Sequence, residues 1–211
     1  MNTKPALWFL ALLTIFYLNT IRADQVYVTE SGVQVDRCAC AWFILRFLDA
    51  EAEFKFFKQG EKPPQGIGFD YYGAPYFHKG VGCSFTAFIK KYPRKEASDQ
   101  QALVALEAIV NDSSGWRQGP KSLAATLQSA IREIAKHKGQ GDDQATISKC
   151  LPLFDYLYAI STKRPAKDFK AQLFAQLEAE EGQNFREHYP KTLQLIKQAE
   201  EQGLSPSSSQ K

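Results

Sequence analysis

Residues 36–49 read Asp-Arg-Cys-Ala-Cys-Ala-Trp-Phe-Ile-Leu-Arg-Phe-Leu-Asp and place charges, thiols and large apolar side chains in one short segment. Asp36 is a favourable N-cap, because its carboxylate can accept hydrogen bonds from the unpaired N–H groups of a first helical turn. At 3.6 residues per turn, Cys40, Ile44 and Phe47 fall on one stripe. The segment therefore predicts a helix that begins at Asp36 and packs this stripe into the core.

Two arginines of the predicted helix are candidate anion ligands. The first turn of a helix offers free N–H groups and the positive end of the helix dipole, and Arg37 adds a forked donor with a fixed charge. Arg46 lies four residues after Trp42 on the same side, where it can stack on the indole or reach an anion. The alternative for both arginines is an ion pair with a surface carboxylate.

A second segment with useful chemistry follows an aromatic run. Residues 69–78 predict a short strand or hairpin. His78 then enters a glycine-containing loop, in which Lys79 and the backbone N–H groups suit an anion. Cys83 stands near the N-terminus of the next predicted helix. Considered alone, a histidine beside aromatic residues is more often a partly buried structural donor than a ligand.

Three blocks of the sequence share their pattern with one known family. They are Asp36-Arg37, Ala39-Cys40, Trp42, Ile44, Arg46-Phe47 and Asp49; then His78-Lys79-Gly80 and Cys83-Ser84-Phe85; and finally Phe154-Asp155 with Leu157-Tyr158-Ala159. Over residues 26–161 the chain resembles the chromate-resistance protein family, whose domain also forms the C-terminal part of chromate-sensing bacterial repressors. Cys38 and Ala41 depart from the family pattern, which usually has an aliphatic residue and a proline there.

The resemblance implies a protein that binds or senses chromate or a related small oxyanion. The ligand-binding residues would be Arg37, Arg46, His78, Lys79 and Cys83. Arginine and helix N–H groups can hold a dianion without catalysis, so a binding protein is favoured over an enzyme.

Two alternatives remain open from the sequence. The first is a metal protein, with Cys40, His78, Cys83 and Asp70 as mixed ligands of a divalent cation, although their spacing matches no compact zinc motif. Apart from this divalent metal, the sequence indicates no cofactor. The second is a thiol-dependent enzyme, either a chromate reductase or one that uses Cys83 as nucleophile and His78 as base.

The N-terminal segment predicts export. Residues 1–23 combine one early lysine with an apolar run and end in Ile21-Arg22-Ala23, which is typical of a secretory signal cleaved after Ala23 and predicts a periplasmic protein. The run is short for a membrane span, so membrane contact is expected only through an uncleaved signal. Without Lys4 and Arg22, 24 basic residues face 23 acidic ones, and the net charge falls from +3 to +1. This balance argues against a nucleic-acid partner, and the sequence identifies no protein partner.

Four cysteines in an exported chain raise the question of disulfides. Cys38 and Cys40 point apart on a helix, which leaves Cys40 with Cys83 as the plausible bridge. The resemblance favours free thiols, because the matching cysteines also occur in cytoplasmic family members. Cys38, in the first helical turn, is expected to have a lowered pKa and to be the most reactive thiol if exposed. Cys150 lies on an apolar stripe and is expected to be a core residue.

The whole pattern predicts an α+β fold that is predominantly α-helical, with a small sheet near the N-terminus followed by a helical bundle. Strands are expected at 25–29 and 53–57, and helices at 86–92, 99–110 and 121–137. A loop is expected at 111–115, and Asp142 or Asp143 is expected to cap a further helix. The expected division is a signal peptide at 1–23, a chromate-resistance-like domain at 24–162, a helical extension at 163–203 and a disordered tail at 204–211. The extension should hold two helices, at 166–181 and 184–202.

Overall fold

The computed structural model describes residues 25–204 except 33, 79, 81, 114–121, 138–141, 163 and 203. The predicted signal peptide and all of the predicted tail except Leu204 therefore lie outside the described residues. The elements in chain order are β1 (Val26–Glu30), α2 (Val35–Phe43), the π-helical turn η1 (Ile44–Leu48), β2 (Glu53–Phe57), β3 (Ile67–Gly68), α3 (Ser84–Lys91), α4 (Ala97–Ser113), α5 (Leu123–His137), α6 (Asp143–Ser161), α7 (Ala166–Glu181), the 3-10 turn η2 (Gly182–Asn184), α8 (Phe185–His188) and α9 (Pro190–Gln202).

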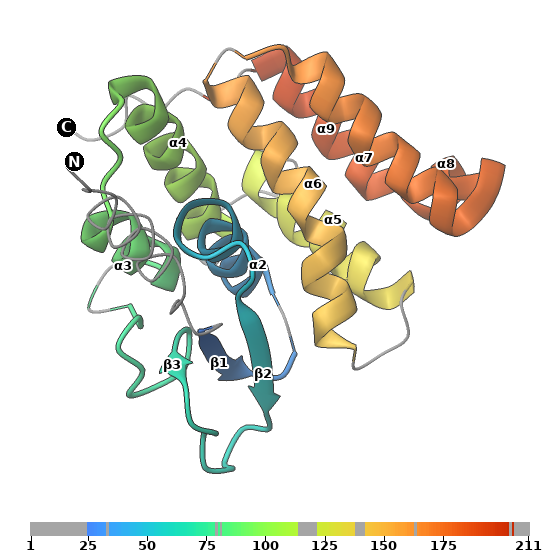
Figure 1. Ribbon diagram of the computed structural model, residues 1–211. Coiled ribbons are helices and arrows are strands. Elements are labelled where there is room, and N and C mark those ends of the chain that lie inside the picture. Colours follow the sequence, from blue (N-terminus) through green and yellow to red (C-terminus); the bar gives the residue numbers. More distant parts are fainter. Residues whose placement is uncertain are drawn as a thin grey trace, which may run out of the picture.

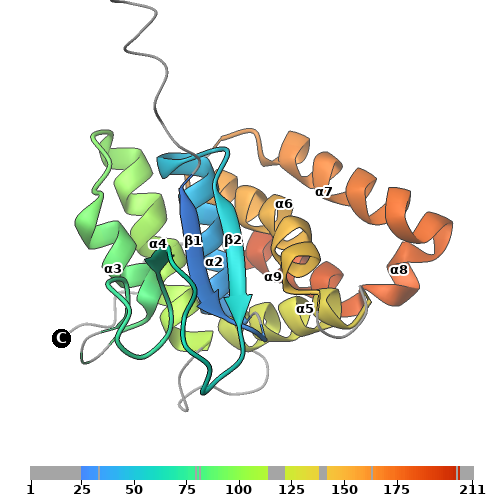
Figure 2. The same ribbon diagram turned by 60° about the horizontal axis from the view of Figure 1, so that its bottom comes forward.

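The sheet is small, parallel and centred on β1. Its strand order is β2-β1-β3, with Val26 opposite Glu53 and Tyr27 opposite Ile67. α2 connects β1 to β2 and lies behind these strands in Figure 2. Because all three strands are parallel, their carboxyl ends meet at one edge, and the chain leaves β1 for the start of α2 at that edge.

Helix α2 lies at the centre of the molecule. It contacts α3, α4, α5 and α6, and its residues from Cys38 to Phe43 are at most 1% exposed. The predicted stripe packs into the core on one side, and neighbouring helices cover the other sides as well. The mainly helical α+β class with a small N-terminal sheet is confirmed (Figure 1).

The C-terminal helices form an outer layer. α7 packs on α6 and α9 packs on α5, so the extension lies on the far side of these two helices from the sheet (Figure 1). The predicted helix at 166–181 is confirmed. The second predicted helix is interrupted at Tyr189, and Pro190 begins α9. Proline is well tolerated at the first position of a helix, because the N–H group there makes no hydrogen bond within the helix. Leu204, the first residue of the predicted tail, is 8% exposed and belongs to the core.

Two other expectations are wrong. The aromatic run 69–78 forms neither a full strand nor a hairpin: β3 ends at Gly68, and a single parallel bridge joins Phe69 to Tyr76. The chain turns at Asp70, whose φ of 51° breaks the extended conformation. Residues 111–113 were expected in a loop, but α4 continues through them to Ser113.

Among the described residues, no helix is long and apolar enough to cross a membrane.

Candidate functional site

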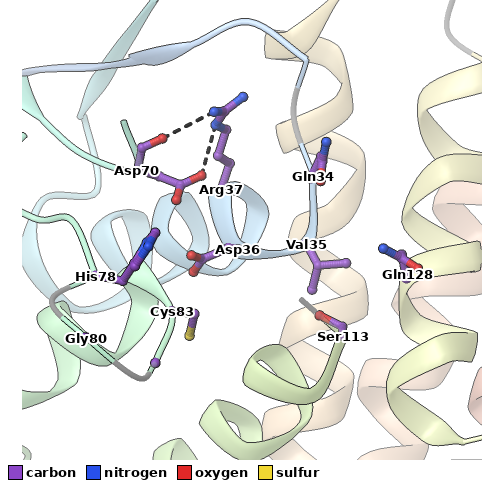
Figure 3. A pocket seen from close by; sticks show the side chains of 11 residues that line it. Gln34, Val35, Asp36, Arg37, Asp70, His78, Gly80, Cys83, Ser113 and Gln128 are labelled. Carbon is purple, nitrogen blue, oxygen red and sulfur yellow. Dashed lines mark hydrogen bonds and ion pairs between the residues drawn. The ribbon is translucent and has the colours of Figure 1, made fainter. Parts of the chain in front are cut away.

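A cavity of about 430 Å³ opens at the carboxyl-terminal edge of the sheet, where the N-termini of α2 and α3 come together (Figure 3). Its lining includes Asp36, Arg37, Asp70, His78, Gly80 and Cys83. Crevices at this edge of parallel sheets are common ligand-binding places. The fold thus brings together several of the predicted ligand residues, which are far apart in the sequence.

Arg37 joins the ends of two strands. Its guanidinium donates to the carbonyl oxygens of Ser31 at 2.9 Å, Gly32 at 3.1 Å and Asp70 at 3.2 Å. It also forms ion pairs with the carboxylates of Glu30 at 3.3 Å and Asp70 at 2.9 Å. The side chain is 13% exposed. An anion that binds Arg37 must therefore compete with these internal acceptors.

Asp36 caps a different helix from the one predicted. α2 begins one residue earlier, at Val35, and the N-cap residue Gln34 makes no side-chain capping bond within the described structure. The Asp36 carboxylate accepts from the backbone N–H groups of Ser84 at 2.6 Å and Phe85 at 2.8 Å, at the start of α3. The prediction that Asp36 caps its own helix is wrong, because these donors come from a distant part of the chain.

Asp70 is the second carboxyl group of the pocket. It accepts a hydrogen bond of 2.7 Å from the Ser84 hydroxyl and interacts directly with the Asp36 carboxyl. Burial and the nearby Asp36 raise the pKa of Asp70 to about 7, although Ser84 and Arg37 act in the opposite direction. The pocket therefore contains a carboxyl pair that can take up or release a proton near neutral pH.

The histidine loop forms another wall of the cavity. His78 lines the pocket (Figure 3), is exposed and lies with its ring 3.9 Å from that of Phe77. Gly80 and Gly82 have φ values of 76° and 137°, which only glycine adopts readily, so the tight loop depends on them. Lys79 lies outside the described residues, and its predicted role stays a prediction.

The thiols near the pocket are poorly suited to act as nucleophiles. Cys83 contacts the Thr86 hydroxyl at 3.6 Å, and Cys40 donates to the Asp36 carboxylate at 3.7 Å. Burial, reinforced by Asp36, raises the pKa of Cys83 to about 12 and that of Cys40 well above its ordinary value. Because the thiolate is the reactive form, this geometry does not favour the thiol enzyme.

Cys38 also differs from its prediction. Its side chain is 1% exposed, and burial together with Cys150 raises its pKa well above the ordinary value. The helix N-terminus was expected to lower the pKa of Cys38, but burial outweighs this effect because a thiolate in an apolar interior loses its hydration. All four cysteines are free thiols, so Cys40 and Cys83 form no bridge.

The ligand set predicted for a metal does not assemble. Within the described part of the chain, no three histidine, cysteine, aspartate or glutamate side chains gather where they could hold one metal ion. Of Cys40, His78, Cys83 and Asp70, only the last three line the cavity.

Arg46 lies apart from the pocket and is already paired. Its guanidinium donates to both carboxylate oxygens of Asp155, at 2.9 and 2.8 Å. The Trp42 indole N–H donates to the same carboxylate at 2.8 Å. Asp155 thus orients two side chains of the α2–η1 segment from α6, and the arginine is not among the residues that line the cavity.

Replacement of Asp155 by alanine is expected to lower the free energy of unfolding by about 1–3 kcal/mol, because the buried Trp42 N–H loses its acceptor. Arg46 adds little to this cost, since its side chain is 41% exposed and can be hydrated. Urea denaturation followed by tryptophan fluorescence measures the change. Asp155→Asn is the matched control: it keeps an acceptor oxygen and should lose less. Equal losses in both variants would contradict this role of the acceptor.

The structure is that of a mainly helical α+β domain with a cavity at the carboxyl-terminal edge of a small parallel sheet. The chain belongs to the family of the ChrB C-terminal domain, whose sequence model matches residues 27–161. Protein ChrB of Cupriavidus metallidurans is 36% identical over 67 residues, which are 31% of this chain and 21% of ChrB. The match thus spans about a fifth of the length of that relative. No solved structure matches the chain.

The family match confirms the resemblance to chromate-resistance proteins. The matched residues include the sheet, the pocket and the helices α2 to α6. The extension α7–α9 lies beyond the matched residues. Sequence reasoning had missed the role of Asp36 at the pocket and the contribution of Ser84. Both residues belong to the sequence blocks shared with the family, and this shared pattern was the feature of the sequence that could have pointed to them.

Proposed function

We propose that this member of a chromate-resistance family binds chromate or a related tetrahedral oxyanion in the cavity beside Arg37. The observation that most strongly supports this proposal is the position of Arg37. Its guanidinium, a forked donor with a fixed charge, lies at the start of α2 in a cavity at the carboxyl-terminal edge of the sheet, where ligands commonly bind. His78, which also lines the cavity, supplies a further donor. A dianion in this place would receive bonds from Arg37 and from the first N–H groups of α2.

The two carboxyl groups of the pocket determine how an anion can enter. The Asp36 carboxylate is stabilised by the N–H groups at the start of α3, so its charge is already compensated. The Asp70 carboxylate is paired with Arg37 and would repel a dianion. When Asp70 takes up a proton, it loses its charge and its hold on the guanidinium weakens. Binding of the oxyanion should therefore be coupled to protonation of Asp70.

The expected pH dependence follows from the pKa of Asp70, about 7. Below this value Asp70 is neutral and Arg37 is available; above it the carboxylate competes with the ligand. Affinity should be about tenfold weaker near pH 8 than near pH 6, because only the protonated fraction binds well. The charged groups near this point are Asp36, Arg37 and Glu30, and the His78 imidazole also lines the cavity.

Calorimetric titration tests both parts of the proposal. Sulfate is the probe for the pH series because its charge is constant in this range, and chromate is titrated in parallel. Asp70→Asn keeps the shape of the side chain without its charge, so it should bind tightly at both pH values. His78→Gln is the second control, because it removes the imidazole from the lining of the cavity and keeps a polar side chain there. Absence of saturable binding of either anion would overturn the proposed function, whereas binding that ignores pH in the unmodified protein would overturn only the role of Asp70.

A further inference from the structure

The cavity beside Arg37 is larger than a free oxyanion requires. Its volume of about 430 Å³ lies in the range of about 300–1,000 Å³ that is common for sites of small organic molecules. A tetrahedral oxyanion consists of four oxygen atoms around one centre, so it would fill only a small part of this space. The remaining volume can hold the rest of a larger ligand that carries such a group.

The lining of the cavity is charged on one side and neutral on the other. Arg37 and Asp70, which form an ion pair of 2.9 Å, lie on the side of the strand ends (Figure 3). Ser113 of α4 and Gln128 of α5 line the side that faces the helical layer (Figure 3). A ligand that matches this lining has a charged head and a neutral, polar body.

The neutral side offers groups that can bind hydroxyls. Gln34, which also lines the cavity, makes no side-chain capping bond at the start of α2. Among the described residues, no group binds the side-chain amide of Gln128. Each amide has one acceptor oxygen and two N–H donors. The Ser113 hydroxyl donates to the Val110 carbonyl oxygen at 2.6 Å, and its own oxygen can still accept.

We propose that the cavity accepts a small phosphate monoester with a hydroxylated body, such as a sugar phosphate, and binds it more tightly than a free oxyanion. This inference rests on the proposed anion site, because the phosphate head takes the place of the free oxyanion beside Arg37. A phosphate monoester is close to a dianion at neutral pH and has three terminal oxygens for the forked guanidinium. Its hydroxyls then reach the amides of Gln34 and Gln128.

A nucleotide matches this lining less well. The rings of Tyr72 and Phe77 contact each other at 6.3 Å, and neither residue lines the cavity. Among the described lining residues, His78 has the only aromatic ring, and this ring already lies 3.9 Å from that of Phe77. A nucleobase would therefore find little to stack on inside the cavity.

Calorimetric titration of the full chain compares probes that share one head. They are inorganic phosphate, glucose 6-phosphate, adenosine monophosphate and n-hexyl phosphate, whose body is apolar. Glucose 6-phosphate is expected to bind at least about tenfold more tightly than inorganic phosphate or hexyl phosphate, because its hydroxyls add hydrogen bonds. Equal affinities for glucose 6-phosphate and hexyl phosphate, or tighter binding of adenosine monophosphate, would overturn this inference and leave the anion site standing. Absence of saturable binding of sulfate, phosphate and all the esters would overturn the proposed function as well.

Variants on the neutral side separate the body of the ligand from its head. Gln128→Ala should weaken binding of glucose 6-phosphate about three- to tenfold and leave the affinity for sulfate unchanged, because the amide lies away from Arg37. Gln144→Ala is the matched control: this exposed glutamine of α6 does not line the cavity, so both affinities should stay the same. Unchanged binding of glucose 6-phosphate in the double variant Gln34→Ala/Gln128→Ala would contradict the proposal, and so would an equal loss for both ligands.

Discussion

Arg37→Met is expected to abolish oxyanion binding and to lower the free energy of unfolding by about 2–4 kcal/mol. Methionine keeps the apolar stem of the side chain and removes every donor. The carboxylates of Glu30 and Asp70 then lose their cationic partner, and the carbonyl oxygens at the ends of β1 and β3 lose their donor. The cost is moderated because Asp70 can take up a proton. Calorimetric titration with sulfate and urea denaturation measure the two effects.

Arg46→Met is the matched control for this experiment. The two arginines belong to one continuous helical segment, and each is paired with a carboxylate. The side chain of Arg46 is 41% exposed against 13% for Arg37, so its loss should cost less than about 1 kcal/mol and leave the affinity for sulfate unchanged. Equal effects of the two substitutions on binding would contradict the location of the site at Arg37.

Trp42→Ala is expected to cause a comparable or greater loss of stability, about 3–5 kcal/mol. The indole is fully buried. It packs against the rings of Phe154 at 5.9 Å, Phe47 at 5.3 Å and Tyr158 at 5.5 Å, which join α2 and η1 to α6. Truncation leaves a cavity among rigid aromatic groups that cannot close around it. Denaturation followed by circular dichroism measures the change, because the fluorescent group is removed.

Trp42→Phe divides this loss into two contributions. Phenylalanine retains part of the aromatic packing, whereas it removes the N–H group that donates to Asp155 and some ring volume. It should therefore cost about 1–2 kcal/mol, well below the alanine variant. A loss in Trp42→Phe as large as that in Trp42→Ala would mean that the hydrogen bond, and not the packing, makes the larger contribution.

Local features of the chain were predictable because they depend on neighbouring residues. The alternation at 53–57 gives the strand that the structure contains, and the helix expected at 121–137 is found as Leu123–His137. Asp142 was one of the two caps expected for the helix that follows, and its carboxylate does accept from the N–H group of Ala145. Capping of this kind joins groups three residues apart, so the sequence holds the information directly.

The pocket was predictable only in part. Arg37, His78 and Cys83 were expected to contribute to one site, and the cavity is lined by all three. Arg46 was expected with them, because the resemblance to the chromate-resistance family implied it as a ligand. Arg46 instead lies in the π-helical turn η1 and pairs with Asp155 of α6, on a side of the helix away from the cavity. Arg37 and Arg46 are nine positions apart, which at about 100° per residue places them on opposite sides of an α-helix, so their spacing already argued against a shared site.

The sequence by itself determined the class of the fold, most of its helices, the family and the segment that contains the site, because backbone periodicity and short motifs act over a few residues. The tertiary structure alone decided the partner of each polar side chain. Asp36 caps α3 instead of α2, and Asp70 shares the guanidinium of Arg37. These contacts join residues that only the packing of the helices and the sheet brings together, and burial in that packing shifts the pKa values of Asp70 and Cys38.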